Sequence, residues 1–123
     1  MPIPDHRLAI CRRCRQPERI ARGASDAESL LSAGRRCAAE GGVDVHVRLS
    51  QCLNCCDGGH TVRVEHQGVE VALVGIRTTD ELQSLVFGHI EAIARREIPA
   101  ALRTRTYQIW VDGELVFHRN LAE

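Results

Sequence analysis

The sequence predicts an α/β fold, a sheet that carries two helices and is extended by a C-terminal β-hairpin. Three observations predict it: short segments with alternating apolar residues, two segments of helical apolar spacing that each begin with a capping signal, and an Asp-Gly pair near the C-terminus. With 123 residues and 44% apolar residues, the chain can build one hydrophobic core and is short for two ordinary domains.

The first half of the chain is predicted to form a strand, a helix and a second strand. Residues 6–10 are a short apolar run. Ser25 followed by Glu28 has the spacing of a capping box, and apolar residues then recur at helical spacing until the glycine pair at 41–42. In residues 43–49, large apolar residues alternate with polar ones, which indicates a strand with one buried face.

The second half begins with two more strands and a second helix. Residues 61–65 and 69–74 are rich in valine, and the tight connection between them contains Gly68, so we expect a hairpin. Thr78 and Glu81 repeat the capping-box spacing, and apolar residues follow at helical intervals until Ile98-Pro99. This is the helix that the pattern predicts most clearly.

A last hairpin is predicted where residues 107–111 and 114–118 flank the Asp-Gly pair, the typical sequence of a two-residue turn. Residues 100–106 are the one linker candidate in the sequence. We therefore divide the chain into a domain of residues 1–99 and a C-terminal hairpin extension of residues 100–123. The order strand, helix, strand, strand, strand, helix suits a thioredoxin-like domain whose first crossover is parallel.

Composition and charge exclude several classes of function. Sixteen basic and sixteen acidic residues balance, so net charge does not favour nucleic-acid binding. All the basic residues are arginine, which excludes a catalytic lysine or a phosphate-loop lysine. No apolar run is long enough to span a membrane, and the first ten residues lack the pattern of a secretory signal, so we expect a cytoplasmic protein.

The six cysteines carry the strongest chemical signal. In a chain without an export signal, clustered cysteines favour metal or redox chemistry over disulfides. Cys11 and Cys14 follow the first predicted strand, and Cys52 and Cys56 follow the next one. Because parallel strands on either side of a crossover helix end at the same edge of a sheet, we expect these four thiolates to converge on one metal site. Cys55 is the alternate to Cys56.

The segment from Cys52 to Gly58, Cys-Leu-Asn-Cys-Cys-Asp-Gly, resembles the Cys-Leu-Gly-x-Cys-x-x-Gly loop of thioredoxin-like 2Fe-2S ferredoxins. Residues 7–97 as a whole resemble a bacterial family of predicted metal-binding proteins related to those ferredoxins. The resemblance implies a thioredoxin-like fold, a 2Fe-2S cluster held in the paired cysteine loops, and a role in one-electron transfer or metal handling. Its partner would be a redox or metal-handling protein, and the hairpin edge adds the expectation of a homodimer.

Arginines lie beside the first cysteine pair, at positions 12, 13 and 15. We expect their charge to offset that of a thiolate-bound cluster. His60 follows the second cysteine segment and is a further candidate ligand, although a surface histidine that opens a strand is the simpler interpretation. Cys37 falls on the apolar face of the first helix, where we expect it to pack in the core.

Two alternatives stay open. Structural Zn²⁺ would accept Cys11, Cys14, Cys52 and Cys55, and the protein would then be a zinc-stabilised interaction module. A dithiol oxidoreductase is the other, because arginines lower the pKa of neighbouring thiols, but here the predicted helix begins well after Cys14. No carboxylate pair and no nucleophile motif predicts hydrolytic or transfer chemistry, so we expect a carrier or metal-binding protein rather than an enzyme.

Overall fold

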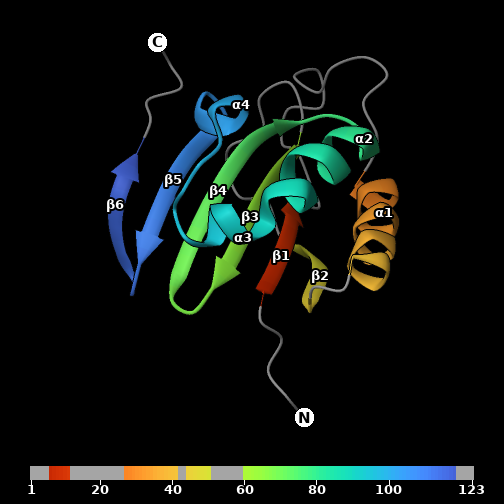
Figure 1. Ribbon diagram of the computed structural model, residues 1–123, viewed down its shortest axis with the longest axis horizontal. Helices are drawn as coiled ribbons and strands as arrows, with labels where there is room; N and C mark the ends of the chain where they lie inside the picture. The colour runs from red at the N-terminus through yellow and green to blue at the C-terminus, as the bar shows by residue number, and fades with distance from the viewer. Residues whose placement is uncertain (1–5, 12–26, 42–43, 51–59, 119–123) are drawn as a thin grey trace.

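The computed structural model describes residues 6–11, 27–41, 44–50 and 60–118. They form a mixed α/β structure with a six-stranded sheet in the order β2-β1-β3-β4-β5-β6 (Figure 1). The strands are β1 (His6–Cys11), β2 (Val45–Ser50), β3 (His60–His66), β4 (Val69–Ile76), β5 (Thr106–Val111) and β6 (Glu114–His118). The predicted α/β class is therefore confirmed.

The strand directions agree with the expected crossover. β1 pairs with β2 in parallel and with β3 antiparallel, and the remaining neighbours in the sheet are antiparallel. α1 (Ala27–Glu40) makes the connection between the two parallel strands. Along β2, His46 and Arg48 are exposed while Val47 between them is buried, which is the alternation that the sequence predicts.

Gly34 lets α1 lie close to both the sheet and the second helix. A Cβ atom at this position would lie 3.0 Å from Cγ1 of Val47 and 3.6 Å from Cδ2 of Leu82. Contacts of 3.0 Å are tighter than those that real Cβ atoms usually make. The absence of a side chain at Gly34 therefore sets the spacing between α1 and β2.

The second helical segment begins as predicted but is not a uniform α-helix. Its N-cap is Thr78, whose Oγ1 accepts a 3.1 Å hydrogen bond from the amide of Glu81. The segment then runs through α2 (Thr79–Glu81), a π-helical turn η2 (Leu82–Val86), a 3₁₀ turn η3 (Phe87–His89) and α3 (Ile90–Ala94). Gly88 lies where the helix is broken, and glycine is a weak helix former. Within the described chain, no helix is long and apolar enough to cross a membrane.

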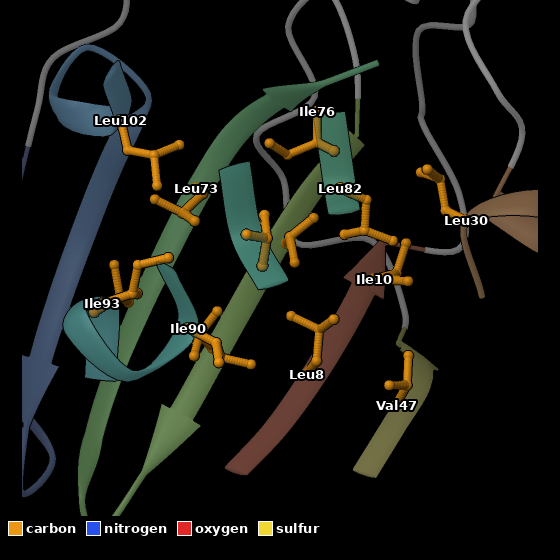
Figure 2. Packing of buried hydrophobic residues seen from close by; sticks show 14 of the residues in the cluster. Leu8, Ile10, Leu30, Val47, Leu73, Ile76, Leu82, Ile90, Ile93 and Leu102 are labelled. Atoms are coloured by element: carbon orange, nitrogen blue, oxygen red, sulfur yellow. The ribbon is translucent and has the colours of Figure 1, made fainter. Parts of the chain in front are cut away.

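The hydrophobic core lies between one face of the sheet and the two helical segments. Figure 2 shows Leu8 and Ile10 of β1 on the face of the sheet that Leu82 and Ile90 of the second segment cover. Fully buried side chains reach from α1 across the sheet to the turn before β5: Leu8, Ile10, Leu30, Leu73, Ile76, Leu82, Ile93, Leu102, Val62, Val64, Val71 and Val86. One continuous core therefore underlies strands β1 to β5.

The C-terminal hairpin continues the sheet. β5 pairs with β4 from Val69 to Leu73, and the segment predicted as a linker forms the short helix α4 (Ala100–Arg103). Leu102 of α4 is fully buried in the core. Residues 100–106, the linker candidate, thus include α4 and the start of β5, and Leu102 supplies apolar area that the sequence pattern did not single out. The division of the chain at residue 99 stays a prediction.

β6 is the last strand of the sheet, and all its side chains are exposed. Leu115, Val116 and Phe117 are 43%, 52% and 38% exposed, respectively. Its pairing with β5 shifts register between Ile109 and Trp110, an irregularity of the kind that bends edge strands.

Candidate metal centre

Cys11 is the last residue of β1, and its side chain is fully buried. Alternation along β1 places its thiol on the face of the sheet opposite to Leu8 and Ile10, away from the helices. The first cysteine of the predicted site is therefore positioned by a core strand whose other face is packed into the hydrophobic cluster.

Ser50, the last residue of β2, lies directly opposite Cys11 in the parallel register of the two strands. Its Oγ lies 3.5 Å from the carbonyl oxygen of Ile10, a longer separation than that of an ordinary hydroxyl hydrogen bond. Cys52 is two residues beyond Ser50 in the sequence. The strand that precedes the second cysteine segment thus ends beside the residue that opens the first.

β3 runs antiparallel to β1, as Figure 1 shows, so its first residue, His60, lies at the same end of the sheet. Its Nδ1 lies 3.3 Å from the carbonyl oxygen of Cys11. A carbonyl oxygen can only accept a hydrogen bond, so Nδ1 of His60 is the protonated ring nitrogen and donates the bond. Only 6% of His60 is exposed, and the interpretation of it as a surface histidine is therefore wrong. The segment with Cys52, Cys55 and Cys56 therefore lies in the sequence between Ser50 and His60, and both of these residues lie against the end of β1.

Most of the predicted ligands lie outside the described residues. These ligands are Cys14, Cys52, Cys55 and Cys56. The arginines expected to offset their charge, Arg12, Arg13 and Arg15, also lie outside the described residues. Within the described ranges, no group of three or more His, Cys, Asp or Glu side chains is arranged to hold a metal ion. The predicted four-cysteine site therefore stays a prediction, with Cys11 its one described member.

Cys37 lies on α1 and is half-buried, outside the core cluster. The expectation that it packs in the core is met only in part, because the C-terminal turns of α1 lie nearer to solvent than Leu30 does. Burial and the nearby carboxylate of Glu40 raise the pKa of the Cys37 thiol, while Arg36 opposes them. A raised pKa disfavours the reactive thiolate form of Cys37.

Ser50 is the residue at this edge that the sequence did not indicate as part of the site. Its position opposite Cys11 depends on the register of β1 against β2, and the sequence of one strand does not reveal how that strand pairs with its neighbour. The close spacing of His60 to Cys56 was the available signal for the histidine.

Comparisons of the chain with protein-family models, curated proteins and solved structures found no match.

Proposed function

We propose that the chain is a thioredoxin-like metal-binding protein that holds a 2Fe-2S cluster with Cys11, Cys14, Cys52 and Cys56. It would act in one-electron transfer or in metal handling, with a redox or metal-handling protein as its partner. The observation that carries the proposal is the meeting of three chain positions at one edge of the sheet: Cys11 opposite Ser50, and His60 hydrogen-bonded to the Cys11 carbonyl.

Chain length supports convergence of the two cysteine segments. Neighbouring strands in a sheet are about 4.8 Å apart. A fully extended chain covers at most about 3.5 Å per residue, so two residues keep the Cα atom of Cys52 within about 7 Å of that of Ser50. By the same limit Cys14 stays within about 11 Å of Cys11. These short connections to two facing residues of the sheet are compatible with one shared site.

The order of elements supports the thioredoxin-like part of the proposal. A parallel β-α-β unit is followed by an antiparallel β-β pair and a helical segment, and the core cluster joins both helical segments to the sheet. The relationship to thioredoxin-like 2Fe-2S ferredoxins is proposed from the cysteine motif. The order of elements is compatible with it.

The donor set fits a cluster or a soft metal ion. Thiolates are the ligands of 2Fe-2S clusters and of structural Zn²⁺, and Cys11 offers a buried sulfur. When bound, the cluster supplies one-electron chemistry. The chain would supply four thiolates, with Cys55 as the alternate to Cys56, and positive charge from Arg12, Arg13 and Arg15 to offset theirs.

The burial of Cys11 weighs against a dithiol oxidoreductase. Thiols that attack disulfides are partly exposed and have low pKa values, often at a helix N-terminus. Cys11 is fully buried at the end of a strand and lacks the exposure that such a thiol needs. Zinc remains the second candidate, because the pairs Cys11/Cys14 and Cys52/Cys55 have the spacing of a tetrahedral zinc site.

Anaerobic purification of the full chain, followed by visible spectroscopy and analysis of iron, acid-labile sulfide and zinc, tests the proposal. We expect a brown-red protein with equal amounts of iron and sulfide. A colourless protein with one zinc per chain would replace the cluster with the zinc alternative. A protein that holds neither metal, even after reconstitution with iron and sulfide, would refute metal binding. Cys37→Ser is the matched control, because Cys37 lies on α1 and should not affect metal content.

A further inference from the structure

We propose that His60 is a positioning residue for this metal centre, which fixes the peptide group of Cys11 without being a ligand itself. The inference rests on the proposed function. It begins from the 3.3 Å contact between Nδ1 of His60 and the carbonyl oxygen of Cys11, a bond between positions 49 residues apart in the chain.

The geometry of the strands separates the imidazole from the thiol. β1 and β3 are antiparallel with Ile10 opposite Val62, so these two side chains share the face that carries the helices. The register of β3 against β4 shifts between Val62 and His60, but His60 lies opposite Ile76, whose side chain belongs to the same core cluster, so His60 falls on that face too, whereas alternation along β1 puts Cys11 on the other. The imidazole therefore acts on the backbone of Cys11, and the sheet lies between its ring and the sulfur.

A fixed carbonyl at Cys11 has a direct consequence for the cysteine segments. The Cys11 carbonyl belongs to the peptide group that links Cys11 to the residues before Cys14. His60 begins β3, directly after the segment that contains Cys52, Cys55 and Cys56. The bond therefore ties the start of one cysteine segment to the end of the other. Hydrogen bonds that orient a ligand residue typically affect metal affinity by about 10–100-fold when they are removed.

His60 is well suited to hold this position. It is 6% exposed, so water competes little for the Cys11 carbonyl. Thr61, the next residue, is fully buried, which anchors the start of β3. Because His60 holds the Cys11 peptide in place before a metal binds, the protein loses less conformational entropy when the metal binds.

Co²⁺ titration of the reduced full chain tests the inference, because its absorption bands report affinity and ligand type together. His60→Leu removes the donor, His60→Asn keeps an N–H near the position of Nδ1, and His60→Gln moves the N–H further from the backbone. We expect Co²⁺ to bind His60→Leu and His60→Gln about 10–100-fold more weakly than the wild type, and His60→Asn within a few-fold of it. The spectrum of the bound ion should be the same in all four proteins.

Equal affinity of the wild type, His60→Asn and His60→Gln would overturn the inference, even if His60→Leu does not fold. A spectrum that loses a nitrogen ligand in every variant would also overturn it, because His60 would then be a ligand. Thermal unfolding of each apo-protein separates positioning from stability: Gly68→Ala, a destabilised variant in the turn at the opposite end of β3 from His60, should bind Co²⁺ as the wild type does. Failure of the wild type to bind Co²⁺ or to incorporate iron and sulfide would instead refute the proposed function.

Discussion

The amide of Asp112 donates a 2.8 Å hydrogen bond to the carbonyl oxygen of Gly68, which joins the turns of two different hairpins. Both turns have two residues with positive φ, Gln67-Gly68 and Asp112-Gly113, as the right-handed twist of the flanking strands favours. The turn between β3 and β4 therefore supports the turn between β5 and β6.

This contact predicts different costs for two equivalent glycine substitutions. Gly68 and Gly113 have φ values of +83° and +84°, so alanine at either position should cost about 1–2 kcal/mol of backbone strain. At Gly113 a new Cβ meets nothing within 4 Å, whereas at Gly68 it would lie 2.5 Å from Oδ1 of Asp112. Urea unfolding should show Gly68→Ala to be the more destabilising. Equal costs would contradict a tight contact between the two turns.

The carboxylate of Glu81 ties the second helical segment to the start of β5. Oε2 accepts from Nη2 of Arg105 at 2.7 Å, and Oε1 accepts from the amide of Arg77 at 2.8 Å. Nη1 of Arg105 also donates to the carbonyl of Gly75 at 2.6 Å. Burial alone would raise the pKa of Glu81, but the hydrogen bonds and charges of Arg77 and Arg105 outweigh it and hold the pKa below its ordinary value.

A lowered pKa predicts a pH dependence of stability. The stabilisation is fully present above the unfolded pKa of glutamate, about 4.3, and is lost as pH falls through the lower folded value. We expect Glu81→Gln to lower the free energy of unfolding by about 1–2 kcal/mol at pH 7 and by less at pH 3. Urea unfolding at pH 7, 5 and 3 measures this, and a difference that stays constant with pH would contradict it.

Glu97→Gln is the matched control for that experiment. Nε of Arg95 lies 3.5 Å from Oε2 of Glu97, but both side chains are more than half exposed, at 59% and 68%. Exposed ion pairs contribute little, so this substitution should change the free energy of unfolding by less than about 0.5 kcal/mol.

Close approach at Gly34 predicts a steep dependence on side-chain size. Gly34→Val should cost about 1–3 kcal/mol, because its methyl groups would overlap Val47 and Leu82. Gly34→Ala should cost less, since the alanine helix propensity offsets a contact that a small shift of Val47 relieves. At Gly88 the nearest atom to a new Cβ is 3.6 Å away, so Gly88→Ala should be neutral or stabilising. Thermal unfolding of the three variants tests this order, and tolerance of Gly34→Val would contradict it.

Sequence patterns predicted the strands and both helical segments because each depends on local apolar periodicity and capping. Thr78 and Asp112 act in the structure as their motifs indicate. Patterns did not predict α4 or the breaks in the second helix, since the burial of Leu102 depends on contacts between distant segments. The same limit applies to the candidate site: the motif predicts Cys11 as a ligand, but its pairing with Ser50 and the burial of His60 depend on strand register.

The central claim is that both cysteine segments contribute to one metal site. Its most direct test is the iron and acid-labile sulfide content of anaerobically purified wild type, Cys11→Ser and Cys52→Ser, with correct folding checked by circular dichroism. We predict that each substitution, one in each segment, removes most of the cluster found in the wild type. Full cluster content in either variant would mean that this cysteine is not a ligand and that the two segments do not share the site as proposed.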